Sequence, residues 1–335
     1  RISLPIVKIA LLGNEISLTN KIETVTGKST LRGLISSGIY INSLTKNVEI
    51  FKVIPTLSPV ALQYFCISNK DNTSEDAGIV ANILRHLLIT ESSFDNEVLD
   101  GKPFEMFHTN WELLYRALQK NGKVMSLHKI YGLHKEEIKI QLQRKTIAFC
   151  HNEIEFPPND KIYDSFKKSF ENLMDYIFVS KKSNNSSFDI VIFERKADGS
   201  GYIAINIECR FSYPNKKTLL ESNEILDKYK LMHDKYLMHV RYLCNRFRLE
   251  SNSWEDGIFY DRSAVGKLKM TKDDIYLVFI VWKNIGKLNY DILNNKNIII
   301  VKRKNLEKIY TPLLVIHPHF YNKILEQINN TIYEN

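Results

Sequence analysis

Two acidic residues, Asp189 and Glu208, lie in neighbouring β-prone runs that could bring their carboxylates together. The runs Phe188–Glu194 and Tyr202–Arg210 are joined by a segment that contains Asp-Gly, a strong hairpin signal between β-branched runs. Antiparallel pairing across this turn puts residue 189 roughly opposite residue 207 or 208. The two carboxylates can then converge at one end of the sheet, where hard oxygen ligands suit Mg²⁺. Such an ion polarises a phosphate and activates a water molecule.

Arg210 follows Glu208 by two residues, so both side chains point to the same face of the predicted strand. Its guanidinium could meet a phosphate, but it stays charged and cannot act as a general base. The hairpin alone also fits a solvated pair, because Asp at a strand start and Glu near a strand end are common exposed positions. Glu194, at the other end of the first run, is interpreted as a solvated charge beside Arg195 and Lys196.

The helices and strands expected around this hairpin predict an α/β domain with a mixed central sheet flanked by helices. Apolar spacing predicts a helix over 104–120, and two more helices are expected over about 161–178 and 218–248. The runs 275–282 and 297–302 are apolar throughout, as expected of strands that helices cover on both faces.

A small, mostly helical domain precedes this sheet. A short strand is predicted over 6–12, and Leu31 and Leu34 lie on the apolar face of a helix that Gly38 ends. A β-prone run, a polar turn and a second β-prone run over 48–53 follow. Helix, strand, turn and strand is the order in which a winged-helix unit finishes.

The boundary between the two domains is predicted in a polar stretch. Residues 57–88 have helical periodicity, and residues 91–103 are the most linker-like part of the chain. The domains are therefore predicted at 1–100 and 104–335.

The order of the elements in the second domain resembles the PD-(D/E)xK nuclease superfamily, a restriction-endonuclease-like fold. Trp111 and Glu112 on the first helix, the run Ser187–Phe193, a Glu-x-basic strand and a long helix after it are similar to the C-terminal region of Crinkler effectors. The run Gly33–Val53 resembles the winged-helix tail of the P-loop NTPase module that precedes such a domain. The resemblance covers about residues 30–300 and rests on the order of elements more than on single motifs.

This resemblance implies residues, a cofactor and partners. Asp189 and Glu208 match the metal ligands for Mg²⁺ or Mn²⁺, and Arg210 stands where the family has Lys. A helix Glu that sometimes completes the site would be Glu112 or Glu171. The implied protein is an effector of a fungus or oomycete, secreted and translocated into host nuclei, that acts on DNA. The upstream NTPase module and a host nuclear protein are further expected partners.

Basic side chains surround the predicted site. Lysine and arginine number 46 against 38 aspartates and glutamates, which gives a net charge of +8 and attracts polyanions. Each basic group alone is most often a solvated face, but on one surface such groups would bind phosphates in a salt-dependent way. The group before the hairpin is Lys120, Lys123, Lys129, Lys135, Lys139, Arg144 and Lys145. The predicted nucleic-acid contacts after it are Lys216, Lys217, Lys228, Lys230 and Lys235.

Composition excludes several other classes of protein. The 335 residues are 44% hydrophobic and 25% charged, which is typical of a globular chain and not of a disordered or fibrous one. Four cysteines without a CxxC motif favour a reducing compartment, and no apolar run is long enough for a membrane helix. The start at Arg1 suggests a fragment of a longer polypeptide.

The segment Gly27–Thr30 resembles the end of a P-loop. A phosphate-binding loop needs glycine at position 22, where this chain has Ile22, so the segment is interpreted as a coincidence or a helix cap. Three hypotheses about function therefore stay open. They are a Mg²⁺-dependent endodeoxyribonuclease, a decayed nuclease fold that binds DNA, and a protein-interaction domain.

Overall fold

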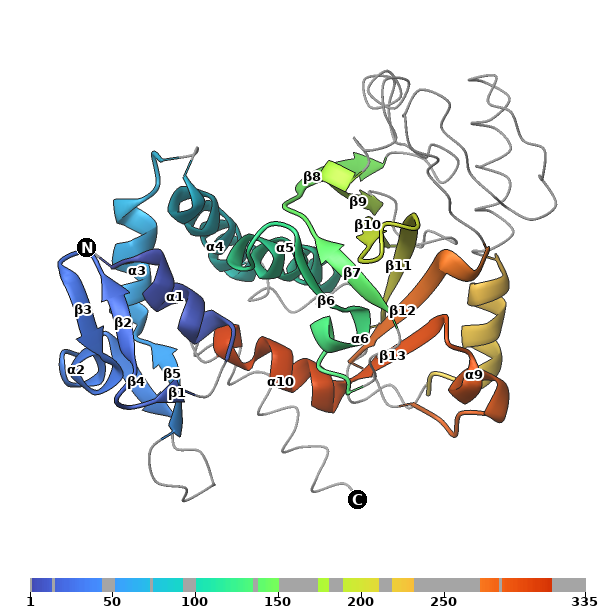
Figure 1. The fold of residues 1–335 in the computed structure, drawn as a ribbon. Coiled ribbons are helices and arrows are strands. Elements are labelled where there is room, and N and C mark those ends of the chain that lie inside the picture. The colour runs from blue at the N-terminus through green and yellow to red at the C-terminus, as the bar shows by residue number, and fades with distance from the viewer. Residues whose placement is uncertain are drawn as a thin grey trace, which may run out of the picture. The chain divides into compact units, whose positions relative to one another are not determined.

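A computed structural model describes most of the chain. The described residues are 2–13, 16–43, 52–72, 75–92, 101–134, 138–150, 174–180, 189–210, 219–231, 272–282 and 285–314 (Figure 1). The chain divides into two compact units. The N-terminal unit comprises residues 1–98, 110–118 and 307–335, and the sheet unit comprises residues 99–109 and 119–306.

The N-terminal unit contains short helices and a small antiparallel sheet of order β1-β5-β4. A separate hairpin pairs β2 with β3. Its elements are α1 (Leu4–Leu11), β1 (Ile16–Ser17), β2 (Lys21–Thr24), β3 (Gly27–Thr30), α2 (Leu31–Ser36), β4 (Tyr40–Ser43), β5 (Lys52–Leu57), α3 (Pro59–Ser68) and α4 (Asp76–Ser92). The predicted order of helix, strand and strand after residue 30 is confirmed by α2, β4 and β5, but β5 runs to Leu57, beyond the predicted end at 53, and residues 48–51 lie outside the described part.

The strand predicted over 6–12 is wrong, because these residues form helix α1. Pro5 lies in its first turn, where the missing N–H costs nothing. The buried side chains are Ile6, Val7, Ala10 and Leu11, which recur at helical spacing and not at alternate positions. A short apolar run cannot be assigned to strand or helix from periodicity alone, and here tertiary burial decides.

Thr30 ends strand β3 and caps helix α2. Its Oγ1 accepts a hydrogen bond from Gly33 N at 3.2 Å, which satisfies one of the unpaired amides at the helix start. The segment Gly27–Thr30 pairs with β2 in an antiparallel hairpin. The interpretation of this segment as a helix cap is therefore confirmed.

Replacing Thr30 by Ala should lower the free energy of unfolding of the N-terminal unit by about 1 kcal/mol, because the Gly33 amide loses its acceptor. Urea unfolding followed by circular dichroism measures the change. Thr30→Ser keeps a hydroxyl at the cap and should stay within a few tenths of the wild type. Equal loss in both variants would contradict the capping role.

The sheet unit is built on an eight-stranded mixed sheet that is curled and flanked by helices (Figure 1). Six strands follow the order β13-β12-β11-β10-β7-β6, and β9 pairs with both β10 and β8. Its strands are β6 (Lys123–Ser126), β7 (Lys139–Leu142), β8 (Thr146–Cys150), β9 (Tyr176–Ser180), β10 (Ile190–Lys196), β11 (Tyr202–Arg210), β12 (Ile275–Val281) and β13 (Ile298–Lys302). The pairs β11–β12, β12–β13 and β8–β9 are parallel, and the other pairs are antiparallel.

Helices contribute the rest of this unit. They are the first part of α5 (Gly101–Leu118), α6 (Leu127–Ile130), a helix over 222–231, α9 (Tyr290–Asn294) and the start of α10 (Arg303–Leu314), with a 3₁₀ turn at Lys272–Asp274. No helix in the described ranges combines the length and the apolar character that a membrane crossing demands.

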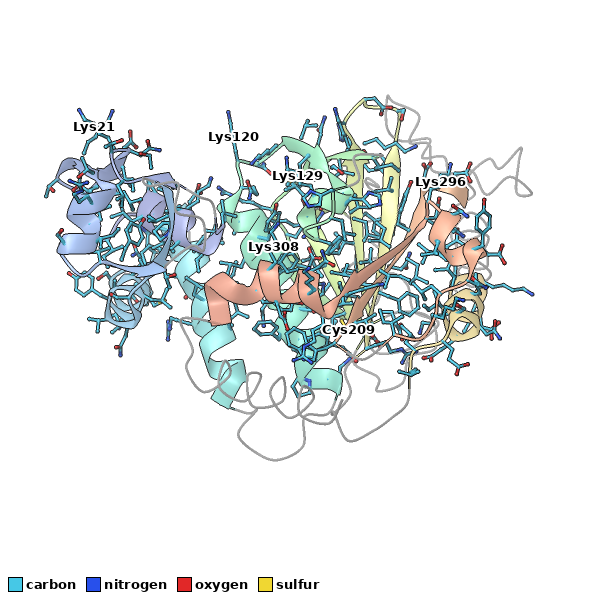
Figure 2. The ribbon with its side chains drawn as sticks, turned by 90° about the horizontal axis from the view of Figure 1, so that it is seen from below. Lys21, Lys120, Lys129, Cys209, Lys296 and Lys308 are labelled. Carbon is cyan, nitrogen blue, oxygen red and sulfur yellow. The ribbon has the colours of Figure 1, made fainter. Side chains whose placement is uncertain are left out.

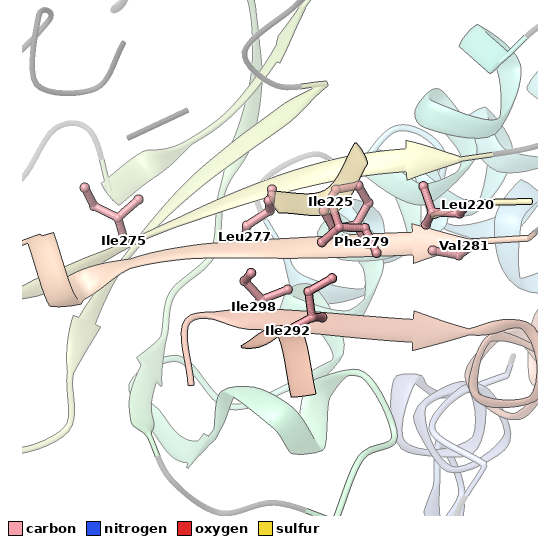
Figure 3. Close-up of a cluster of buried hydrophobic side chains, with 8 residues drawn as sticks. All are labelled: Leu220, Ile225, Ile275, Leu277, Phe279, Val281, Ile292 and Ile298. Atoms are coloured by element: carbon pink, nitrogen blue, oxygen red, sulfur yellow. The ribbon is translucent and has the colours of Figure 1, made fainter. Parts of the chain in front are cut away.

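Strand β12 runs through the middle of the hydrophobic core, and all seven of its residues are buried. Alternate residues from Ile275 to Val281 pack with Ile225 of the helix over 222–231 and with Ile292 of α9 (Figure 3). Trp282, directly after the strand, contacts Phe104 of α5 with ring centroids 6.3 Å apart. The prediction that the apolar run at 275–282 forms a strand buried on both faces is therefore confirmed for β12. The predicted α/β class, with a mixed sheet flanked by helices, is confirmed as well.

One helix prediction fails within the described residues. The helix expected over about 161–178 cannot extend to its predicted end, because Tyr176–Ser180 is strand β9 between β8 and β10. Residues 161–173 lie outside the described part of the chain. Of the helix expected over 218–248, residues 222–231 are described and helical.

Candidate functional site

The hairpin of β10 and β11 brings the two predicted carboxylates to the same end of the sheet. The strands pair from Ile190 with Ile207 to Arg195 with Tyr202. Asp189 directly precedes β10, and its N donates to Ile207 O at 3.1 Å, one residue out of the ladder register, so Asp189 lies beside Ile207 and Glu208 at the end of the hairpin. The predicted hairpin is therefore confirmed, with its turn after Lys196.

Asp189 is a buried acid with 7% of its surface exposed. Its Oδ2 accepts a hydrogen bond from Cys209 N at 2.7 Å, beyond the last backbone pair of the hairpin. Burial, followed by the negative charge of Glu105, raises the pKa of Asp189 to about 6. The Cys209 amide and the charge of Lys228 act in the opposite direction but do not cancel the rise.

Glu208 is buried more deeply, with 2% of its surface exposed. Lys228 Nζ lies 2.7 Å from its Oε2, and Arg210 Nη2 lies 3.1 Å from its Oε1. Burial, followed by repulsion from Asp189, raises the pKa of Glu208 to about 7 despite these two cations. The carboxylates therefore form a strongly desolvated pair that favours additional positive charge.

The helix over 222–231 supplies one of these cations. Lys228 is 8% exposed, and Glu224, one turn before it, contacts Arg210 Nη2 at 3.3 Å. Residues four apart share a helix face, so this face of the helix lies against the end of β11. Lys228 is one of the predicted nucleic-acid contacts, but its ammonium group contacts the carboxylate of Glu208. Lys230, another predicted contact two residues later, is exposed.

The other predicted nucleic-acid contacts Lys216, Lys217 and Lys235 lie outside the described residues. Of the basic group before the hairpin, Lys120, Lys123, Lys129 and Lys139 are exposed, and Lys120 extends away from the ribbon (Figure 2). Lys145 is buried. Lys145 therefore cannot belong to an exposed basic surface, and Lys135 lies outside the described residues.

The helix carboxylate whose charge acts on Asp189 is Glu105, not the predicted Glu112. Glu112 is fully buried in the N-terminal unit and forms an ion pair with Arg116. Glu105 lies seven residues earlier on α5 and is held by Lys102 Nζ at 2.6 Å. Lys102 also donates to Ser180 O, at the end of β9.

Glu105 is not among the residues that the sequence predicted for the site. A signal was present, because residues seven apart share a helix face and Glu112 was already a candidate. The alternative candidate Glu171 lies outside the described residues.

The interpretation of Glu194 as a solvated charge is wrong. Glu194 is fully buried, and its Oε2 lies 3.4 Å from Lys145 Nζ. Lys145 also donates to Phe193 O at 2.8 Å. Strand β10 has partners on both sides, β11 on one and β7 and β9 on the other, so its end is interior to the sheet and not at an edge. Cys209, next to Glu208 on β11, is buried.

The donor set suits a small, hard divalent ion. Asp189 and Glu208 offer carboxylate oxygens from the same end of the hairpin, and burial is the main cause that raises the pKa of both groups, with mutual repulsion added at Glu208. Within the part of the chain that the structure describes, no group of three or more His, Cys, Asp or Glu side chains is placed to share an ion. A metal would therefore be held by the two hairpin carboxylates, with water in its remaining positions.

Comparison with known proteins identifies no relative of this chain. No family model, no curated protein and no solved structure matches the chain.

Proposed function

We propose that the sheet unit is a metal-dependent phosphodiesterase domain of PD-(D/E)xK type that acts on DNA. The observation that carries the proposal is the end of the β10–β11 hairpin, where Asp189 accepts a hydrogen bond from the Cys209 amide and its charge acts on Glu208 in a buried site. Mg²⁺ or Mn²⁺ bound there would polarise a phosphate and activate water. The two carboxylates would hold this ion.

Arg210 has the position of a phosphate contact. Its side chain is 36% exposed, and it stands two residues after Glu208 on the same face of β11. A guanidinium at this edge neutralises charge that develops on phosphorus. Glu105 adds negative charge beside Asp189 and strengthens the attraction for a divalent ion.

The order of elements supports the same assignment. Helix α5 precedes the hairpin, and a helix over 222–231 and the parallel strand β12 follow β11. In the N-terminal unit, α2 is followed by β4 and β5 in a sheet of order β1-β5-β4, which agrees with a winged-helix tail. We extend the proposal to a Crinkler-type effector that acts in host nuclei, beside an upstream NTPase module or a host protein. This extension rests on the resemblance of the sequence.

Plasmid nicking tests the proposed chemistry. Wild-type protein with Mg²⁺ or Mn²⁺ should nick supercoiled DNA, and Asp189→Ala should reduce the rate by roughly 100-fold or more because the ion loses a ligand. Glu221→Ala, an exposed acid ahead of the helix over 222–231, is the matched control and should keep the wild-type rate. Absence of nicking by the wild type with either ion, or equal rates in Asp189→Ala, would refute the proposal.

A specific observation favours a second function, a nuclease fold that binds DNA without cutting it. Both oxygens of Glu208 already contact a cation, Lys228 on one and Arg210 on the other. Such a site is neutralised without metal. This alternative expects DNA affinity that falls steeply with salt and that neither Asp189→Ala nor a chelator changes. A gel-shift titration in salt, with and without Mg²⁺, separates it from the first proposal.

A further inference from the structure

We infer that Lys228 is an internal cation that holds Glu208 in the metal-free protein and leaves it when a divalent ion binds. The inference rests on the metal site of the proposed function. It concerns the side chain that occupies this site when no metal is bound, and not the cleavage of a phosphate.

The geometry at Glu208 leads to this inference. Lys228 Nζ lies 2.7 Å from Oε2, and the carboxylate of Glu208 is 3% exposed. Mg²⁺ binds oxygen at about 2.0–2.1 Å, so an ion on Oε2 would stand directly beside the ammonium group. Two like charges on one buried oxygen repel each other strongly. The ion can therefore take Oε2 only if the ammonium group moves away.

Lys228 is the group to be displaced, rather than Arg210. The Arg210 side chain is 36% exposed and shares its charge between Glu208 and Glu224. The charges of both cations act on Asp189 and on Glu208, but the Lys228 side chain is only 9% exposed. It therefore occupies the buried side of the carboxylate pair. The flexible four-carbon stem of lysine allows its ammonium group to swing away without movement of the helix.

An internal cation of this kind has an energetic consequence. Two carboxylates cannot be buried side by side without positive charge, and Lys228 supplies it from the same chain. A divalent ion must then compete with a charge that is held at the site by the fold. Wild-type affinity for metal should therefore be lower than the carboxylates alone would give.

Calorimetry with Mn²⁺ alone tests the competition. Lys228→Met removes the charge and keeps the length of the side chain, and it should bind Mn²⁺ roughly tenfold more tightly than the wild type. Lys230→Met, an exposed lysine on the same helix, is the control and should bind as the wild type does. Unchanged or weaker binding by a folded Lys228→Met variant, or no binding by either protein, overturns the inference.

Labelling of wild-type protein gives a second measurement that needs no variant. Reductive methylation of lysines, read residue by residue by mass spectrometry, should modify Lys228 slowly without metal and several-fold faster with saturating Mg²⁺. Lys230 is the internal reference and should react at the same rate in both conditions. Labelling of Lys228 that does not respond to Mg²⁺ overturns the inference.

These readouts separate the inference from the proposed function. Tight Mn²⁺ binding by Lys228→Met without nicking by any variant refutes the phosphodiesterase and leaves the role of Lys228 intact. Nicking by the wild type with unchanged Lys228 labelling refutes the role of Lys228 and leaves the phosphodiesterase intact.

Discussion

Replacing Lys145 by Met should lower the free energy of unfolding of the sheet unit by about 3–5 kcal/mol. The Lys145 and Glu194 side chains are fully buried, and the variant leaves the Glu194 carboxylate without its cation. Lys145 also donates to Phe193 O, which loses that donor. Removal of one partner from a buried pair costs far more than the pair contributes, because the remaining charge has lost its water as well. Urea unfolding measures the change as a shift in midpoint at constant slope.

The double variant Lys145→Met/Glu194→Leu identifies the cause. Replacing both charges by apolar groups of similar size should recover most of the lost stability, since no isolated charge remains. Lys139→Met, at an exposed position of β7, is the matched control and should change stability by less than about 0.5 kcal/mol. A double variant as unstable as Lys145→Met would show that packing, and not the unpaired carboxylate, determines the loss.

The stability of the sheet unit should fall as the pH rises from about 4 to about 7. The pKa values of Asp189 and Glu208 rise from 3.8 to about 6 and from 4.5 to about 7 on folding. The folded protein then binds protons that the unfolded chain has released, so their contribution to stability is complete below pH 4 and is lost by pH 7. Each such proton changes the free energy of unfolding by up to about 1.4 kcal/mol per pH unit.

The variant Asp189→Asn/Glu208→Gln isolates this effect from the other titrating groups. Its unfolding free energy, measured in urea at half-unit steps of pH, should lack the decline between pH 4 and 7 that the wild type shows. Glu221→Gln changes an exposed acid and should keep the wild-type profile. If wild type and double variant have parallel profiles, the two carboxyl groups are not desolvated in the folded protein.

Both predictions concern charges that the fold removes from water. Neither side chain of the Lys145 and Glu194 pair is exposed. The site at Asp189 and Glu208 differs, because Arg210 keeps part of its side chain in solvent at the strand end. An accessible edge next to desolvated acids is where a ligand that carries charge can enter.

The sequence by itself determined the hairpin and the position of its acids. Asp-Gly between two β-branched runs specifies a tight turn, and the hairpin pairing that follows brings Asp189 beside Ile207 and Glu208. The doubly covered strand β12 follows from its unbroken apolar run in the same way. These features are local, since neighbours along the chain are sufficient to define them.

Only the tertiary structure decided which charges are buried and which partners they have. Nothing in the sequence distinguishes Glu194 from an exposed glutamate. It is buried because β10 has neighbouring strands on both sides. Lys228 reaches Glu208 from a helix, and Glu105 acts on Asp189 from another element more than eighty residues away. The desolvation and pairing of a charge depend on atoms that are distant in the chain, so periodicity and spacing carry no information about them.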